Sequence, residues 1–475
     1  MAEPAVASRL LDTLRLAERP RPRAVARWPH AHWLAVGTVC LGAFLGQLTA
    51  SVTSLVFPTL EDHFGAPFAA VEWVSLAYLL VLVALLAPVG RLSDLVGRKT
   101  MYLGGFAVFA AASLGAGLAG NLGLLIACRA VQAVGGAMMQ ANSVALVARG
   151  VPERAMRTAL GVQAAAQALG LALGPTLGGL LVAHASWRWA FWVNAPIGVI
   201  GMLAGWFLLP RTFPDGRRPA RTAGREGRFD LAGLLLLAAA STGLLLALSA
   251  ASGLPLPGWA VAVLLAAAAA GTLALVRQER RADRPIIPPG LVNTPGIRAG
   301  LLVALIGYLL LFCPLVLEPA VLAGRGATTT AAGAAITALP AAFALAATVG
   351  GALLPRHWSD AARCRRGALT AAAGLLALAA LPAPGPWTTA APLLLTGYGL
   401  GLLLPANNAL VMRAIPAQSS AVGGGLVNMV RSLGTALGTA LPVLAVHQVG
   451  APAGGRVVPL LLAATAVLAV RLCRG

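Results

Sequence analysis

Three ionisable side chains stand inside long apolar stretches of the sequence: Arg129, Glu318 and Arg431. A charge in such surroundings is costly unless it faces water or an opposite charge, so each is a candidate functional residue. A carboxyl group in an apolar cavity binds a proton more readily than one in water, so Glu318 is the candidate proton-coupling site. Two structural alternatives stay open. Arg129 could be a purely structural hydrogen-bond donor to backbone carbonyls. Glu318, which lies late in its apolar stretch, could face lipid headgroups.

The elements that would hold these charges are transmembrane helices. Of 475 residues, 58% are apolar and 11% are charged. A bilayer span needs about 20 apolar residues, and such runs recur along the chain. Because lipid offers no partner to unpaired backbone groups, and because the runs do not alternate, helices are favoured over strands. The sequence therefore predicts an all-α integral membrane protein.

Fourteen spans are expected, arranged as six, two and six. The division predicts a basic tail (1–32), a first six-helix bundle (33–209), basic loops with a two-helix insertion (210–296) and a second six-helix bundle (297–475). The expected spans are 33–58, 72–90, 101–120, 122–147, 158–183, 189–209, 231–251, 257–276, 298–322, 331–354, 367–382, 388–412, 421–446 and 457–472.

The basic residues are distributed asymmetrically. Thirty of the 35 Lys and Arg residues fall in alternate loops and the two tails, while only Arg188, Arg325 and Arg456 fall in the other loops. This is the positive-inside pattern, which predicts cytoplasmic termini in a plasma (inner) membrane and explains the net charge of +20 without nucleic acid. The excess of arginine over lysine, with much Ala and Gly, favours a bacterial source.

One loop pattern occurs at equivalent places in both predicted bundles. Between the second and third spans of the first bundle stand Gly90, Asp94, Gly97, Arg98 and Lys99; the second bundle has Asp360 followed by Arg363. Each is an Asp followed by a basic cluster in a short loop. Such repetition is typical of transporters built from two related halves around a midplane site.

These residues resemble the major facilitator superfamily, and within it the fourteen-helix drug:proton antiporters. The first loop is similar to the superfamily signature, which implies that Asp94 latches the two halves by pairing with a helix N-terminus and with Arg98. The fifth span is similar to the antiporter signature, which implies sealing against leak and export; it contains Gly170, Gly174, Pro175, Gly178 and Gly179. The stretch from Arg129 to Gly136 resembles the fourth-span motif, with Ala133 in place of the motif's first glycine, which implies that Arg129 handles protons.

Polar residues inside the spans are candidates for lining a substrate cavity. They are Gln47, Thr49, Gln132, Gln163, Gln167, Asn407, Asn408 and Asn428. For Gln163 and Gln167, hydrogen bonding between helices is the alternative. Thr49 marks a departure from the family, because exporters of cationic drugs usually carry an Asp there. The missing Asp weakens the prediction that lipophilic cations are exported.

The numbers and spacing of the lysine and histidine residues argue against several classes of enzyme. The only lysine, Lys99, follows Arg98, so the Gly-Lys pair of an ATP-binding P-loop is absent. The six histidines show no metal-site spacing with acidic or thiol partners. We therefore expect no cofactor, with a proton gradient as the energy source, and expect a small-molecule substrate, protons and the bilayer as partners of a monomer.

The sequence predicts export of small amphipathic or drug-like molecules by proton antiport through alternating access. A dedicated exporter of one endogenous metabolite is the main alternative. A non-transporting membrane sensor built on a transporter fold is a further one.

Overall fold

The computed structural model describes residues 18, 20–211, 230–282, 285, 289–348, 358–381, 385–415 and 420–473. Most of the predicted tail and of the basic linker between Pro210 and Arg228 lies outside these residues. Throughout the described ranges, all regular secondary structure is α-helical.

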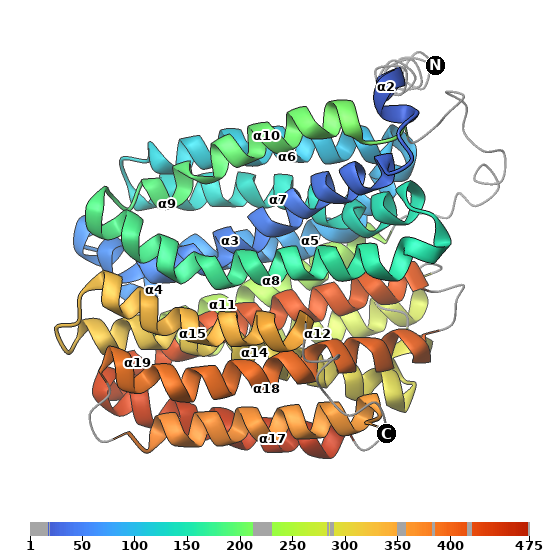
Figure 1. The fold of residues 1–475 in the computed structure, drawn as a ribbon. Coiled ribbons are helices and arrows are strands. Elements are labelled where there is room, and N and C mark those ends of the chain that lie inside the picture. Colours follow the sequence, from blue (N-terminus) through green and yellow to red (C-terminus); the bar gives the residue numbers. More distant parts are fainter. Residues whose placement is uncertain are drawn as a thin grey trace, which may run out of the picture.

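The first half of the chain folds into a group of roughly parallel helices, coloured blue to green in Figure 1. They are α2 (Arg23–Ala26), α3 (Ala31–Phe64), α4 (Phe68–Val71), α5 (Trp73–Val96), α6 (Arg98–Gly117), α7 (Leu122–Gly150), α8 (Glu153–His184), α9 (Trp189–Trp192) and α10 (Asn194–Leu208). The long members of this group follow the apolar runs of the sequence.

The rest of the chain forms a helix pair and a second group, which run from yellow-green through orange to red in Figure 1. The pair is α11 (Leu231–Ala251) and α12 (Gly258–Arg281), and the short α13 (Pro289–Val292) follows. The second group is α14 (Pro295–Ala323), α15 (Thr329–Thr348), α17 (Asp360–Ala379), α18 (Pro386–Ala414) and α19 (Ser420–Leu472).

Local side chains explain several helix boundaries. The Asn121 side chain accepts a hydrogen bond from the N–H of Leu124 at 2.8 Å and begins α7. Asp230 does the same for Gly233 at 2.8 Å and begins α11. Such caps satisfy N–H groups that have no partner inside the helix. Gly97, with φ 119°, is the single residue between α5 and α6, a conformation that favours glycine.

Twelve candidate membrane spans occur within the described residues. Helix α17 is not among them, because it carries three arginines, Arg363, Arg365 and Arg366, in its first two turns. Helix α19 counts once, although Gly450 (φ 78°, ψ 159°) interrupts it and divides it into two helices. The structure therefore confirms an all-helical membrane architecture, while the predicted fourteen spans and cytoplasmic termini stay predictions.

The two halves meet along two seams. At one seam α8 packs closely on α15, and at the other α5 packs on α19. Helix α11 contacts both α5 and α19, so the inserted pair covers the second seam from the side. Each half has its own apolar core, with Leu76, Phe106 and Phe109 in the first and Leu375 and Leu403 in the second.

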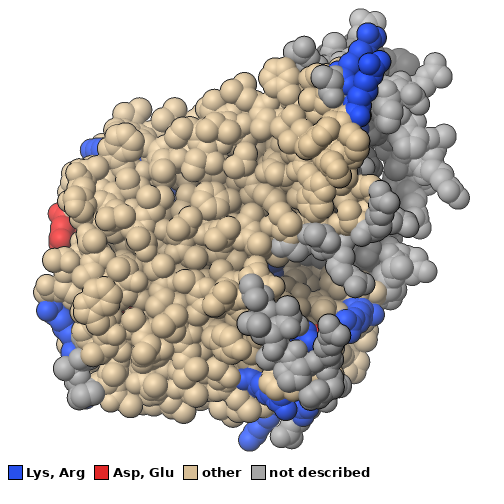
Figure 2. Space-filling view, in the orientation of Figure 1, with Lys and Arg blue, Asp and Glu red and all other residues tan. Residues whose placement is uncertain are grey.

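The surface matches a lipid environment. Figure 2 shows a broad face free of blue and red, with the charged side chains gathered toward its two edges. Large apolar side chains such as Leu173, Leu203, Leu345 and Leu461 are exposed on the outside of the bundle. Helix α2 and the C-terminal end of α19 lie at the same end of the molecule (Figure 1), which we call the basic end because it also carries Arg211.

Candidate functional site

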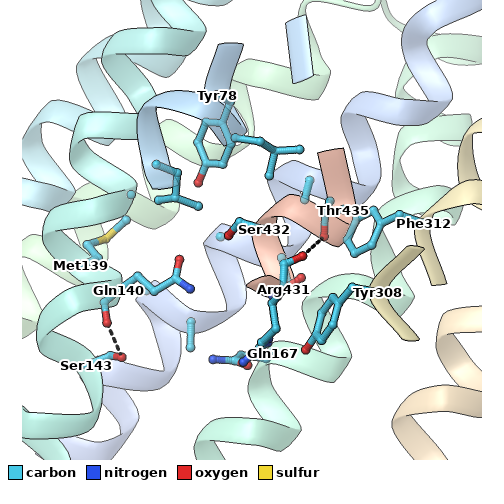
Figure 3. Close-up of a pocket in the computed structure, with 18 of the residues that line it drawn as sticks. Tyr78, Met139, Gln140, Ser143, Gln167, Tyr308, Phe312, Arg431, Ser432 and Thr435 are labelled. Carbon is cyan, nitrogen blue, oxygen red and sulfur yellow. Dashed lines mark hydrogen bonds between the residues drawn. The ribbon is translucent and has the colours of Figure 1, made fainter. Parts of the chain in front are cut away.

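A cavity lies where the two halves meet. Its empty space is about 750 Å³, including the part open to solvent. Helices α3, α5, α6, α7 and α8 line it from the first half, and α14 and α19 from the second. Figure 3 shows Met139 and Gln140 on one side, Tyr308 and Phe312 on the other, and Arg431 between them.

Arg431 projects from α19 into this cavity and is half-buried. Its guanidinium carbon lies 4.6 Å from the centroid of the Tyr308 ring, a cation–π arrangement. Its Nη1 donates to Asn428 Oδ1 at 3.2 Å. No carboxylate among the described residues lies within ion-pair distance of Arg431.

Arg129 is placed differently, in a buried hydrogen-bond network of the first half, beside a small pocket that Phe312 and Thr435 of the second half also line. It is 1% exposed. Its Nε donates to the Val74 carbonyl oxygen at 2.8 Å and its Nη1 donates to Gln132 Oε1. Gln132 in turn donates to Ser113 Oγ at 2.6 Å. Arg129 also lies 4.5 Å from the centroid of the Tyr78 ring and lines this small pocket, which shares Tyr78 with the main cavity.

Glu318 lies on α14 and lines neither of these two pockets. It is 1% exposed, and its Oε1 has no hydrogen-bond partner within the described part of the chain. This burial does not fit the alternative in which Glu318 faces lipid headgroups. A buried carboxyl oxygen without a donor is stabilised by binding a proton.

The polar candidates separate into two groups. Gln47 and Gln167 line the cavity, and Asn428 reaches it through Arg431. The others lie outside this lining. Gln132 belongs to the Arg129 network, Asn407 donates to the Gly300 carbonyl oxygen at 2.8 Å, and Thr49 Oγ1, Gln163 Oε1 and Asn408 Oδ1 are buried polar atoms without a partner in the described structure.

The predicted gating loop is shorter than expected, because α5 continues through Gly90 and Asp94 to Val96. Lys99 is buried, and its Nζ donates to the carbonyl oxygens of Trp206 at 2.9 Å and Leu209 at 2.8 Å. It therefore ties the start of α6 to the end of α10. Gly97 separates α5 from α6, and Arg98 begins α6. The Asp94 side chain lies outside the described part, so its predicted latch with Arg98 stays a prediction.

The corresponding acid of the second half begins α17. Asp360 pairs with Arg413, at the end of α18, at 2.8 Å between Nη1 and Oδ2. Arg363 lies one turn later on α17, and its Nε is buried without a hydrogen-bond partner among the described residues. This acid therefore joins α17 to α18 within its own half.

The glycine-rich segment of α8 provides close approach to two neighbours. Side chains at Gly170, Gly174 and Gly178 would meet α3, and a Cβ at Gly179 would come within 2.9 Å of the Thr329 carbonyl oxygen on α15. The Pro175 carbonyl faces Gly333 of α15. The hydroxyls of Thr176 and Thr337 form a hydrogen bond of 2.5 Å across the same seam. Small residues therefore hold the two halves together at the end opposite the basic end.

Tyrosines are the cavity residues that sequence reasoning missed. Tyr78, Tyr102 and Tyr308 line the cavity, and the chain has only four tyrosines. All four tyrosines, Tyr398 included, lie inside predicted spans, and this was the available signal, because a buried hydroxyl needs a polar partner. Gln140, Ser143, Ser432 and Thr435 complete the polar lining.

Comparison with known proteins identifies the class. A family model described as the Major Facilitator Superfamily matches residues 39–439, so the chain belongs to that superfamily. The "Riboflavin transporter RibZ" of Clostridioides difficile is 28% identical over 86% of this chain and 87% of its own length. The "Tetracenomycin C resistance and export protein" of Streptomyces glaucescens is 28% identical over 88% and 77%. The "Methylenomycin A resistance protein" of Streptomyces coelicolor is 29% identical over 87% and 85%.

The fold agrees with this class. The structure of the human organic anion transporter MFSD10 (TETRAN) superimposes with a TM-score of 0.60, covering 94% of this chain and 100% of that one at 18% identity. The protein is thus a transporter of this superfamily, similar to proteins named for drug resistance and export, and not an enzyme. It is a multi-pass protein of the bacterial inner membrane that carries a small molecule across the bilayer.

Proposed function

We propose that this transporter exports small amphipathic molecules in exchange for protons, with the proton gradient as its energy source and no bound cofactor. The observation that carries the proposal is the cavity of about 750 Å³ lined by both halves of one chain. In alternating access, the two halves rock so that such a cavity opens to one side of the membrane and then to the other. The names of the tetracenomycin and methylenomycin relatives favour export.

The proposal includes a topology of fourteen spans in a monomer with cytoplasmic termini. Counting α17 as a span and α19 as two raises the twelve candidates to fourteen. An even number puts both ends on one side, and the basic end is then cytoplasmic by the positive-inside rule. In this proposal the two moving bodies are the predicted bundles 33–209 and 297–475. The insertion between them covers one of the seams where they meet.

Glu318 is the proposed coupling carboxyl. It is buried with an unpartnered oxygen, so protonation removes a charge from an apolar site. Arg129 or Arg431 would respond to this change in charge, because the two facing states of the protein place the arginine differently relative to Glu318. The exchange requires that the protonated and charged forms favour different facing states, since a ligand shifts an equilibrium only by binding one state better.

Accumulation of fluorescent dyes in inverted membrane vesicles tests export and coupling together. We expect accumulation when the lumen is acidic and none without the gradient. The Glu318→Gln variant should abolish the effect of the gradient, whereas the matched Glu61→Gln variant, at the end of α3, should keep it. Transport unaffected by Glu318→Gln would remove that residue from coupling, and movement of no compound would contradict export.

Alternating access has a separate test at the α8–α15 seam. Cysteines at Thr176 and Thr337, in a variant without the five native cysteines, should form a disulfide, because the two hydroxyl oxygens lie 2.5 Å apart. The cross-link should stop transport and reduction should restore it. Full transport by the cross-linked protein would show that this seam does not open.

A dedicated exporter of one endogenous metabolite is the second candidate. Thr49 stands where related exporters of cationic drugs usually have an Asp, and the relative named as a riboflavin transporter fits a single metabolite. Expression in an efflux-deficient host distinguishes the candidates. Protection against many unrelated drugs favours the broad exporter, and protection against none favours the dedicated one.

A further inference from the structure

The charge balance of the central cavity is one-sided. Its nineteen lining residues within the described part of the chain include one cation, Arg431, and neither an Asp nor a Glu. The other polar groups that line it are amides and hydroxyls of Gln, Ser, Thr and Tyr. A permanently charged cation would therefore meet no opposite charge in this cavity.

Arg431 has donors left for a ligand. A guanidinium carries five N–H groups, and within the described structure this side chain donates to Asn428 and lies beside the Tyr308 hydroxyl, so further N–H groups are left for a ligand. The Tyr308 ring centroid lies 4.6 Å from the guanidinium carbon, and these two neighbours do not use all of the N–H groups. The remaining N–H groups can form the paired hydrogen bonds that arginine makes with carboxylates.

Arg129 adds a second positive charge close by. Its partners, the Val74 carbonyl, Gln132 and the Tyr78 ring, are all neutral. Tyr78 lines both the cavity and the pocket of Arg129. Two arginines that have no carboxylate partner among the described residues, in a region of low dielectric, give the cavity a positive potential that attracts anions and repels cations.

The shape and remaining chemistry of the cavity favour a flat ring system. Tyr78, Tyr102, Tyr308 and Phe312 supply aromatic surfaces, and Met139 is an adaptable sulfur contact. The side-chain amides of Gln47, Gln140 and Gln167 can donate hydrogen bonds to ring oxygens or nitrogens and can accept them from ring N–H groups or hydroxyls. A second, apolar pocket between α5, α11 and α19 shares Leu79 and Ser432 with the cavity and offers room for an apolar substituent.

From these observations we infer that the cavity selects planar aromatic molecules that carry a carboxylate or a similar anionic oxygen group, with Arg431 as the residue that binds the anion. The inference rests on the proposed export and names its substrate class. It also assigns specificity against lipophilic cations to the absence of an Asp or Glu among the described residues that line the cavity.

Two dyes that share a xanthene ring test this class directly. Fluorescein is an anion and rhodamine 123 a cation, and their binding to purified protein in lipid nanodiscs is measured by fluorescence anisotropy. We expect fluorescein to bind at least tenfold more tightly. Arg431→Gln should remove this preference, Arg431→Lys should retain part of it, and the control Arg277→Gln, on the exposed surface of α12, should leave it unchanged.

Several results would overturn the inference. Rhodamine binding as tight as fluorescein, no binding of fluorescein, or full fluorescein affinity in Arg431→Gln would each do so, and the comparison of dyes in the unmodified protein needs no variant to fold. Proton-driven uptake into inverted vesicles separates this inference from the proposed function. Fluorescein that binds but is not moved would leave the substrate class standing and contradict export, whereas gradient-driven movement of rhodamine alone would support export and overturn the class.

Discussion

The two intramembrane arginines occupy different kinds of site. Arg129 is fully buried, and its hydrogen bonds join α7 to α5 and, through Gln132, to α6. Arg431 is half-buried in the cavity between the halves, with one hydrogen bond to its own helix. Both lie against a tyrosine ring at nearly equal distances, 4.5 Å and 4.6 Å.

This difference teaches that an arginine inside a span can be either a structural centre or a ligand-binding group. Arg129 and Arg431 look alike in the sequence, because each is an arginine inside an apolar run. The number of N–H donors that the protein itself uses distinguishes them. We therefore expect mutations of Arg129 to act mainly on stability and mutations of Arg431 mainly on binding and transport.

The largest effect is expected at Arg129. Arg129→Leu leaves the Val74 carbonyl and Gln132 without their donor inside the bundle, a loss of about 2–5 kcal/mol of stability. This corresponds to a fall of about 5 °C or more in the unfolding midpoint. A thermal unfolding assay on purified protein measures it, with Arg431→Leu as the matched variant. Equal midpoints for the two variants would remove the structural distinction between the arginines.

A smaller effect on stability but a clear one on transport is expected at Arg431. Arg431→Gln should lower transport of the best substrate at least about tenfold, equivalent to about 1.4 kcal/mol, because the ligand loses a charged partner. The unfolding midpoint should stay within about 2 °C of the unmodified protein, since few internal bonds are lost. Initial rates in vesicles at limiting substrate, normalised to folded protein, measure the change. Unfolding as severe as in Arg129→Leu would contradict it.

The smallest effect is expected at the ring beneath Arg431. Tyr308→Leu removes the aromatic face that positions the guanidinium, and cation–π contacts contribute about 0.5–2 kcal/mol. Substrate affinity should fall about threefold to tenfold in a binding titration. Tyr308→Phe keeps the face and should stay within about twofold. If Phe is as harmful as Leu, the hydroxyl and not the ring face supports Arg431.

The sequence predicted the helices well and their boundaries less well. Long apolar runs determine α3, α7, α8 and α14, because the bilayer requires about 20 apolar residues per span. The loop expected from Gly90 to Lys99 proved to be mostly helix. Short-range composition does not distinguish a polar helix end from a loop, and the positive φ of Gly97 is the one break.

The site was predictable only as a set of unusual residues. Arg129, Glu318 and Arg431 stand out in sequence because each is a charge in an apolar run. Which of them share a cavity depends on how seven helices from two halves pack, and no local pattern contains that information. The same limit explains why Gln167 lines the cavity whereas Gln163, one turn earlier on α8, lies outside its lining.

A matched pair of glutamines on α7 tests the central claim, that the region around Arg431 is an aqueous substrate path and the region around Arg129 is closed. Gln140 lines the cavity, whereas Gln132 is fully buried beside Arg129. Single cysteines at these positions, in a variant without native cysteines, are treated with a water-soluble thiol reagent in membranes. The account predicts rapid labelling at position 140, slowed by a bound substrate, and little labelling at position 132. Equal labelling at both positions, or labelling at 132 alone, would contradict it.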